Sequence, residues 1–319
     1  MRLGKQRHES KYLAIEYFKT NKDWSISWMC HQLGITRSAF YKWKHRIVPE
    51  QEQLNNEIAE LIKEYDERFS HILGYRRMTD WINHFNHTNY SRIHRIMKIL
   101  DIHAVIRKKR KRYKTAKPEE TAENKLARNF YTTAPNKKWV TDVTEFKIPN
   151  SRKKLYLSAI LDLYDRYPIA FVISGRNDNR LVFKTFDKAI EKYPTAKPIF
   201  HSDRGFQYTN KHFQKKLKDT DMIQSMSRVG HCIDNGPIEG FWGIIKSEMY
   251  QMYDITDETS LRYAIKDYIR FYCQDRPQSR YDCKTPLEVR NAALTSEHPL
   301  SYPIAKNNKI EKYKSKWSA

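Results

Sequence analysis

The stretch HCIDNGPIEGFWGIIKSEMY, residues 231–250, decides how this chain is interpreted, together with HSDRGFQYTN at 201–210 and KWVTDVTEF at 138–146. Each stretch holds one acidic residue in a setting where an acid is unusual. Asp142 follows an apolar, strand-like run, Asp203 ends another, and Glu239 lies in the first turn of an amphipathic helix. Lys246 follows the glutamate by two helical turns, so the two side chains share one helix face.

Carboxylates in this arrangement predict a metal site. Hard divalent cations prefer oxygen ligands. Two such ions, about 3.5 to 4 Å apart, activate an attacking oxygen and stabilise the leaving oxygen of a phosphodiester. We therefore predict that Asp142, Asp203 and Glu239 are both metal ligands and catalytic residues. Four further acids compete for this role and are interpreted as structural or turn residues, or as lying too far along the helix: Asp162, Asp165, Asp234 and Glu248.

In these residues the chain resembles the DDE transposases and integrases of the retroviral-integrase superfamily. Within them it resembles the OrfB-type transposases of the IS-three group of bacterial insertion sequences. The resemblance keeps the group's order and spacing over residues 138–289 and rests on WVTDVTEF, HSDRGFQY, DNGPIEGFWGIIKSE and FYCQDRPQSRYDCKTPLEV. Cys273 stands where the group usually has Asn. The resemblance implies a ribonuclease H-like fold in which the strand of Asp142 neighbours the strand that ends at Asp203.

The resemblance also implies an activity and its partners. The expected protein is a DNA transposase that binds terminal inverted repeats, cuts DNA to free a 3′-hydroxyl and transfers that strand to target DNA. The implied cofactor is Mg²⁺, as two ions, with Mn²⁺ as a substitute. The implied partners are double-stranded DNA, further copies of the chain in a homodimer or larger oligomer, and an upstream OrfA protein or OrfA fusion.

Charge and composition agree with a polyanionic partner. The chain has 59 Lys and Arg against 37 Asp and Glu, a formal charge of +22. Nucleic acid is the first candidate for such a partner, and an acidic membrane surface is the second. We expect no membrane association, because no run of about 18 apolar residues exists and the N-terminus lacks the apolar core of a signal peptide. The expected location is the bacterial cytoplasm, on the nucleoid when DNA is bound.

The N-terminal region predicts a helix-turn-helix over residues 1–48. Helical patterns over residues 11–20 and in ISWMCHQL precede Gly34, and the basic, aromatic ITRSAFYKWKHR follows it. The residues expected to contact DNA are Arg37, Ser38 and Lys42. An ordinary helical hairpin with a solvated basic face is the alternative. The four cysteines lack zinc-finger spacing with histidines, so this DNA reading would need no zinc.

Residues 49–116 predict a second helix-turn-helix module that ends in a basic arm. Helical patterns occur over residues 54–69, after GYRRM with Phe85 on the apolar face, and in SRIHRIMKILDI, which we expect Ser91 to cap. Arg92 and Arg95 are candidate DNA contacts. The arm holds further candidates that repel one another until a polyanion neutralises them: Arg107, Lys108, Lys109, Arg110, Lys111 and Arg112. A solvated linker is the alternative for the arm.

The remaining chain divides into a linker over residues 117–135, a catalytic domain over 136–290 and a basic tail over 291–319 that either contacts DNA or is disordered. Strand patterns in KWVTDVTEFKI, KLYLSAILDLY, PIAFVISG, KPIFHSD and MIQSMS, interrupted by helices, predict a mixed five-stranded sheet. The fold class is thus multidomain: all-α DNA-binding modules followed by an α/β domain. Lys246 is expected to contact a DNA phosphate, and Trp242 to stack on a base while Phe241 packs in the core.

Two other functions fit parts of these observations. A ribonuclease H-like nuclease without strand transfer would keep the three acids but would have little use for two DNA-reading modules. A DNA-binding regulator would need only residues 1–117, and the intact set of acids argues against it.

Overall fold

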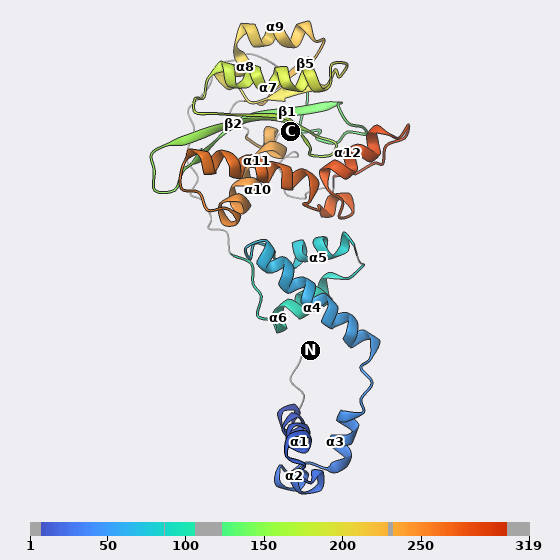
Figure 1. Cartoon of the computed structure of the whole chain (residues 1–319). Helices are drawn as coiled ribbons and strands as arrows, with labels where there is room; N and C mark the ends of the chain where they lie inside the picture. The colour runs from blue at the N-terminus through green and yellow to red at the C-terminus, as the bar shows by residue number, and fades with distance from the viewer. Residues whose placement is uncertain (1–7, 86, 106–122, 229–231, 305–319) are drawn as a thin grey trace, which may run out of the picture. The chain divides into compact units, whose positions relative to one another are not determined.

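The computed structural model describes residues 8–85, 87–105, 123–228 and 232–304. The chain divides into two compact units, Met1–Val105 and Ile106–Ala319, and Figure 1 labels their helices and strands. Among the described residues, no helix combines the length and the apolar character needed to cross a lipid bilayer.

The first three helices enclose a small core of their own. They are α1 (Glu9–Lys22), α2 (Ile26–Gln32) and α3 (Arg37–Lys44). Thr36 caps α3 by accepting a hydrogen bond from the backbone N–H of Ala39 at 3.2 Å. Gly34 lies between α2 and α3 with φ of 64°, a left-handed conformation that favours glycine. Ile15 and Phe40 are fully buried in this core. The helices and the glycine turn therefore lie where the pattern predicted them.

The next three helices are α4 (Glu50–Arg68), α5 (Tyr75–Asn83) and α6 (Tyr90–Ile99). Two details differ from prediction. The cap of α6 is Asn89, which accepts from the N–H of Arg92 at 2.8 Å, and not Ser91. Phe85 lies beyond α5 and is 71% exposed. The cause is Asn83, whose side chain accepts from the N–H of Thr88 at 2.8 Å and closes a turn there.

A mixed sheet organises the second unit, with strand order β3-β2-β1-β4-β5. Its strands are β1 (Lys138–Lys147), β2 (Lys154–Asp162), β3 (Pro168–Ser174), β4 (Ile199–Ser202) and β5 (Ile223–Met226). β2 pairs antiparallel with both β1 and β3, whereas β4 runs parallel to both β1 and β5. This is the ribonuclease H-like arrangement, and it confirms the predicted mixed five-stranded sheet.

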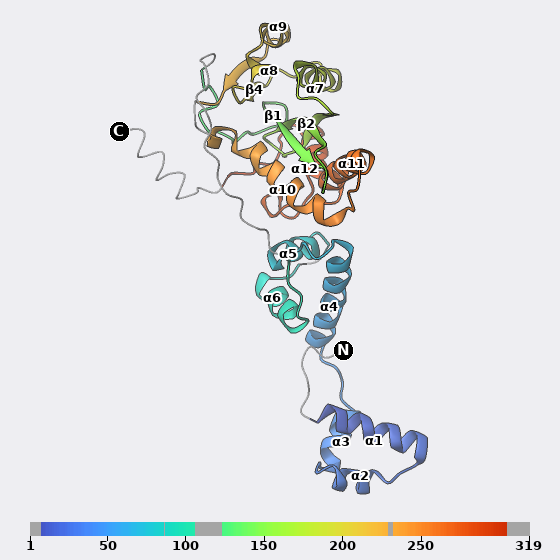
Figure 2. The same cartoon turned by 90° about the vertical axis from the view of Figure 1, so that its left-hand side faces the viewer.

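Helices cover both faces of this sheet (Figures 1 and 2). One face carries α7 (Asn179–Lys192), α8 (Phe206–Thr209) and α9 (Lys211–Asp219), and the other carries α10 (Gly236–Met252) and α11 (Glu258–Gln274); α12 (Pro286–Leu294) follows. Side chains alternate along β1, as the period of a strand requires. Trp139 packs into the core under α7 and α9, and Val140 and Phe146 pack into the core under α10 and α11. β1 thus joins the two cores.

The part of the predicted linker that the structure describes is packed against the sheet and is not a loose tether. Leu126 is 2% exposed, and its N–H donates to Ser225 Oγ at 2.9 Å. Near the other end of the unit, the ring of Tyr302 packs against those of Tyr164 and Tyr281, so this part of the predicted tail is also held. The sequence pattern did not predict that these two segments pack against the domain, because only single residues in each segment make the contacts.

Candidate active site

Strand register places Asp142 and Asp203 side by side. In the parallel pair of β1 and β4, Val140 lies opposite His201. Asp142 is two residues beyond Val140, and Asp203 is two residues beyond His201, so the two acids have the same offset. β4 ends at Ser202, directly before Asp203. The predicted adjacency of these two strands is confirmed.

Helix α10 runs along β1 in a matched register. Four helical residues rise about 6 Å, and two strand residues rise about 6.6 Å, so every fourth helix residue meets every second strand residue. Three contacts follow this rule: Trp242 Nε1 donates to Asp142 Oδ2 at 2.9 Å, Lys246 Nζ donates to Thr144 Oγ1, and the ring of Tyr250 lies 6.3 Å from that of Phe146. Glu239 lies one turn before Trp242, and it is near enough to Asp142 and Asp203 for the charges to interact.

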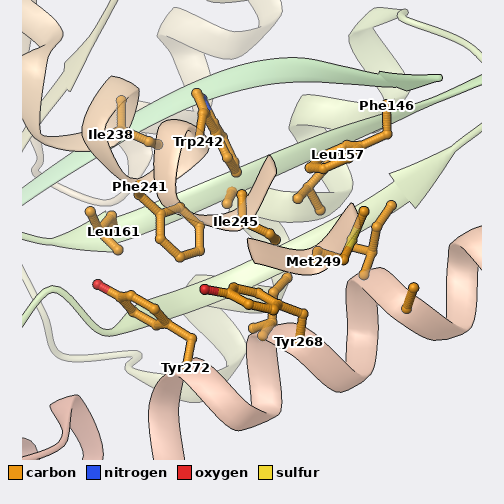
Figure 3. Close-up of a cluster of buried hydrophobic side chains, with 14 of the residues drawn as sticks. Phe146, Leu157, Leu161, Ile238, Phe241, Trp242, Ile245, Met249, Tyr268 and Tyr272 are labelled. Carbon is orange, nitrogen blue, oxygen red and sulfur yellow. The ribbon is translucent and has the colours of Figure 1, made fainter. Parts of the chain in front are cut away.

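Figure 3 shows how α10 is seated. Phe241, Trp242, Ile245 and Met249 lie between the sheet and α11, and all four are at most 6% exposed. Because these residues fix the helix on the sheet, the position of Glu239 depends on core packing and not on a loop.

The three acids interact electrostatically. Burial and then the charge of Asp203 raise the pKa of Asp142 to about 7, against the hydrogen bond from Trp242. Burial and then the charge of Asp203 raise the pKa of Glu239. Burial also raises the pKa of Asp203, against a hydrogen bond from the N–H of Gly205. Three carboxylates thus lie near one another, and burial disfavours the charged form of each.

The acids do not form a closed metal site in this conformation. Across the described ranges, no three His, Cys, Asp or Glu side chains lie close enough to hold one ion. Glu239 is exposed as a whole residue, although its carboxylate is sufficiently desolvated to raise its pKa, and Asp142 and Asp203 are half-buried. The donor set nevertheless fits a hard divalent cation, since it consists of carboxylate oxygens whose repulsion a cation would relieve. The three-acid metal site therefore stays a prediction.

The turn after β4 holds Asp203 in place. The N–H of Gly205 donates to Asp203 Oδ1 at 2.9 Å. A Cβ at Gly205 would stand 3.0 Å from Asp203 Oδ1 and 3.0 Å from Gln207 Oε1. The φ of Gly205 is −58°, which any residue adopts. Glycine is therefore needed here for the close approach of the carboxylate and not for an unusual backbone angle.

His201, in β4 two residues before Asp203, helps to hold this turn in place. It is fully buried, and its ring nitrogens lie 2.9 Å from Ser225 Oγ and 3.2 Å from Ser227 Oγ. Burial lowers its pKa to about 4. A neutral imidazole with a hydrogen-bond partner at each ring nitrogen is suited to positioning the strand end.

Known proteins share the domains of this chain. Two models described as integrase core domain match residues 132–232 and 220–286, and a model described as HTH-like domain matches residues 53–110. A 31 kDa protein of insertion element IS600 from Shigella sonnei is 30% identical over 266 residues, which cover 82% of this chain and 97% of that protein. The chain belongs to the insertion-sequence transposases.

A second relative is the putative transposase InsK of insertion sequence IS150 from Escherichia coli K12. It is 40% identical over 186 residues, and the match spans 57% of this chain and 65% of InsK. Among solved structures, the catalytic core domain of HTLV-2 integrase in complex with magnesium matches with a TM-score of 0.38 and 22% identity, over 49% of this transposase and 97% of that chain.

Three of the competing acids are structural in the transposase. Arg290 Nη1 lies 2.8 Å from Asp165 Oδ2 and 3.3 Å from Asp162 Oδ2. Glu248 binds the guanidinium of Arg276 through two hydrogen bonds of 2.9 Å. These buried pairs explain the acids without a metal, as the sequence predicted.

Asp234 differs from its predicted role as a turn or cap residue. It is fully buried and joins two arginines: Arg128 Nε donates to Oδ1 at 2.6 Å, and Arg228 Nε donates to Oδ2 at 3.0 Å. Arg128 comes from a distant stretch of sequence, so local turn chemistry could not reveal this junction. The hydrogen bonds hold the pKa of Asp234 well below its ordinary value, although burial acts in the opposite direction.

The prediction that Trp242 stacks on a base is wrong for this conformation. Trp242 is 6% exposed and Phe241 is 2% exposed. Both rings belong to the core under α11, and the indole N–H of Trp242 is directed to Asp142. The pattern could not separate a base-stacking ring from a core ring because both follow the same helical face.

The remaining predicted DNA contacts are spread over several elements. Arg37, Ser38 and Lys42 are exposed on α3, and on α6 Arg95 is exposed and Arg92 half-buried. Lys246 Nζ lies 5.2 Å from the ring centroid of Phe146 and contacts Thr144. The arm residues lie outside the described residues: Arg107, Lys108, Lys109, Arg110, Lys111 and Arg112.

Two polar residues close to the acids were not identified from the sequence. Tyr208 is 1% exposed, and its hydroxyl lies 3.1 Å from Thr141 Oγ1. Burial, followed by the charges of Asp142 and Asp203, raises its pKa well above the ordinary value. Asn235 Nδ2 donates to the carbonyl of Thr141 at 3.2 Å. Both residues lie inside the motifs quoted above. Their closeness in sequence to the acids is therefore the signal that could have identified them.

Proposed function

We propose that this transposase binds the terminal inverted repeats of an insertion sequence, cuts there to free a 3′-hydroxyl, and directs that hydroxyl onto a phosphodiester of target DNA. Asp142, Asp203 and Glu239 are the proposed catalytic residues. The observation that supports the proposal is the matching position of Asp142 and Asp203 on neighbouring parallel strands, together with the electrostatic repulsion between these two carboxylates and Glu239. One set of ligands would serve both chemical steps.

The proposed cofactor is Mg²⁺, bound as two ions, with Mn²⁺ as a substitute. When bound, such ions activate the attacking oxygen and stabilise the leaving oxygen. The chain contributes ligands whose orientation is already fixed: the indole N–H of Trp242 holds Asp142 Oδ2, and the N–H of Gly205 holds Asp203 Oδ1. Fixed ligands reduce the reorganisation needed when a cation arrives.

DNA binding is proposed for the helical modules. Arg37, Ser38 and Lys42 on α3 and Arg92 and Arg95 on α6 are the proposed contacts, with Lys246 on α10 directed to a phosphate near the cut. The arm of residues 107–112 would add contacts to the DNA backbone. The formal charge of +22 supports a phosphate-rich partner.

We further propose that the transposase acts as a dimer or larger oligomer on DNA, together with an upstream OrfA protein or OrfA fusion, in the bacterial cytoplasm. These proposals rest on the family to which the chain belongs.

A plasmid assay tests the proposed function. Supercoiled target DNA, labelled end DNA and Mg²⁺ are incubated with the wild type, with Asp203→Asn and with Asp219→Asn. Asp219 is an exposed acid on α9 and serves as a control of equal charge change. We expect joined products with the wild type and with Asp219→Asn, and none with Asp203→Asn.

Other outcomes would support the alternatives. Cleavage of end DNA without joined products would indicate a nuclease. DNA binding that Asp203→Asn leaves unchanged, with no products from any variant, would indicate a regulator. Titration with Mn²⁺ followed by electron paramagnetic resonance counts the bound ions, and a single ion would contradict the two-ion proposal.

A further inference from the structure

A groove of about 890 Å³ runs along the outer edge of the sheet in the second unit. Its floor is formed by residues 167–173, which include most of β3. Its walls come from α7 and α11, which lie on opposite faces of the sheet. The groove is separate from the three catalytic acids, because none of them lines it.

The floor of this groove is the backbone of an edge strand. Within the part of the chain that the structure describes, β3 pairs only with β2 and ends the sheet order. Arg262 Nη1 donates to the carbonyl of Ile173 at 3.2 Å, so this carbonyl points into the groove. Because backbone groups alternate in direction along an antiparallel strand, the N–H and C=O of Phe171 share that direction. A strand edge of this kind offers main-chain hydrogen bonds to a further strand.

The walls of the groove are positively charged. Among the described residues five cations line it, against the single acid Glu191: Lys188, Lys192, Arg262, Lys266 and Arg270. Glu258 and Asp267 each pair with one of the arginines. Burial, followed by the charge of Arg290, lowers the pKa of Lys192. The three lysines carry more positive charge than Glu191 can neutralise. The rim therefore favours an anionic partner.

The floor between these charges is apolar. Phe171, Val172 and Ile173 of β3 line the groove and are half-buried, so they present apolar surface there, whereas Ile169 and Ala170 are almost fully buried. An occupant therefore has to satisfy three demands together: hydrogen bonds to a strand edge, apolar contact with the floor, and negative charge at the rim.

We propose that the groove receives an extended, acidic segment of a partner protein, which adds to β3 as a sixth strand. Alternate side chains of such a strand point to opposite faces of the sheet. Acidic residues on one face would therefore meet Lys188 of α7, acidic residues on the other face would meet Lys266 of α11, and apolar residues between them would pack against the floor. The proposal goes beyond the proposed DNA chemistry and does not depend on it.

Two other occupants satisfy only part of these demands. Pairing β3 with β3 of a second copy would bring two cationic rims together, and like charges in contact oppose association. A DNA duplex would place phosphates on the rim, but it would leave the strand edge without partners and the apolar floor uncovered. The acidic strand is the occupant that meets all three demands.

The test uses the full chain and a fluorescein-labelled peptide in which Glu-Glu pairs alternate with Val-Val pairs, so that each face of the extended peptide carries both residue types. Val favours the extended conformation. A second peptide of the same sequence carries N-methyl groups on alternate amides, which removes the hydrogen-bond donors of one edge. Fluorescence anisotropy measures binding of both peptides to the wild type and to variants. We expect the methylated peptide to bind at least about tenfold more weakly, since strand addition depends on main-chain hydrogen bonds.

Charge reversal on the rim gives the second readout. The double variant Lys188→Glu and Lys266→Glu should weaken binding of the unmethylated peptide by at least about tenfold, because rim charges attract it. The single variant Lys215→Glu on α9, which does not line the groove, should bind within about twofold of the wild type. Circular dichroism melting of each variant shows that the fold is retained.

Three results would overturn the proposal. Equal affinity for the methylated and unmethylated peptides would exclude strand addition. Equal weakening by Lys215→Glu would show attraction to net charge alone. Displacement of the peptide by a duplex of random sequence, with matching loss of duplex binding in the double variant, would make the groove a DNA surface. Strand-transfer activity is not part of the readout, so failure here leaves the proposed function standing.

Discussion

The indole Nε1 of Trp242 donates a hydrogen bond of 2.9 Å to Asp142 Oδ2. This bond joins α10 to β1 at Asp142, one of the proposed catalytic acids. Trp242 lies one helical turn after Glu239, and its ring is buried in the core that seats the helix. The orientation of one predicted metal ligand and the position of another therefore depend on the same residue.

The substitution Trp242→Phe keeps an aromatic ring and removes the N–H. We expect the variant to fold, to bind Mg²⁺ about 10- to 100-fold more weakly and to lose strand transfer to a similar extent, because residues that orient metal ligands have effects of that size. Titration calorimetry with Mg²⁺ measures the affinity directly, without relying on activity.

Phe241→Leu is the matched control for this prediction. Phe241 packs against Tyr272 at a ring-centroid distance of 4.9 Å, on the side of α10 that faces α11. The control should lower the free energy of unfolding by about 1 kcal/mol and leave Mg²⁺ affinity unchanged. An unchanged Mg²⁺ affinity in Trp242→Phe would show that the indole serves packing alone.

The raised pKa of Asp142 predicts a pH-dependent stability. Its pKa is about 7 in the folded chain, against an ordinary value of 3.8. Between these values the folded chain holds a proton that the unfolded chain has released. The contribution of Asp142 to stability is therefore complete below the ordinary value and is lost as the pH rises through about 7. A pKa difference of one between the folded and the unfolded chain corresponds to about 1.4 kcal/mol, so the loss is on the order of a few kcal/mol.

Asp142→Asn isolates this contribution, because the amide does not titrate. Denaturant unfolding with chelator present gives the free energy of unfolding at each pH. As the pH rises from 3.8 to about 7, we expect the free energy of unfolding of the wild type, minus that of Asp142→Asn, to fall. Added Mg²⁺ should stabilise the wild type more at alkaline pH. A difference that stays constant with pH would contradict the raised pKa.

Much of this site was predictable because its chemistry is local. Asp142 and Asp203 stand at the ends of apolar runs, and Glu239 opens an amphipathic helix, so each acid marks a place where a buried element meets a carboxylate. The strand order followed from the family resemblance. The boundary between α2 and α3 followed from the glycine turn at Gly34, whereas the predicted cap Ser91 is replaced by Asn89.

Contacts between distant segments were not predictable. The bond from Trp242 to Asp142 spans 100 residues and that from Arg128 to Asp234 spans 106. An amphipathic pattern shows that Trp242 faces inward but does not show what its N–H meets there. Leu126 anchors a segment that composition alone describes as a polar linker. Such contacts depend on sheet register, which no local pattern contains.

The ion pair of Glu248 and Arg276 predicts a stability effect without a catalytic one. Both side chains are buried, and Tyr268 also donates to the carboxylate at 2.7 Å. Glu248→Gln would leave the guanidinium buried without a counter-charge, and this costs about 3 to 5 kcal/mol. Glu258→Gln, which breaks the more exposed pair with Arg262, should cost less than about 1 kcal/mol.

Denaturant unfolding measures both effects, and strand transfer per folded molecule should stay unchanged in each variant. A loss of strand transfer in Glu248→Gln at a temperature where the protein remains folded would assign Glu248 a part in the chemistry, contrary to its place beneath α11.

Lys42 on α3 predicts a salt-dependent contribution to DNA binding. Its side chain is exposed on the helix expected to enter the major groove. If Lys42 neutralises one phosphate, Lys42→Ala should reduce the slope of log affinity against log salt by about 0.9, because one fewer counterion is released. The control Lys218→Ala removes the same charge from α9. Titration of end DNA at several salt concentrations, followed by fluorescence anisotropy, gives both slopes. Equal slopes for the two variants would show that α3 does not contact the DNA backbone through Lys42, and the ordinary helical hairpin would then be the better interpretation of this module.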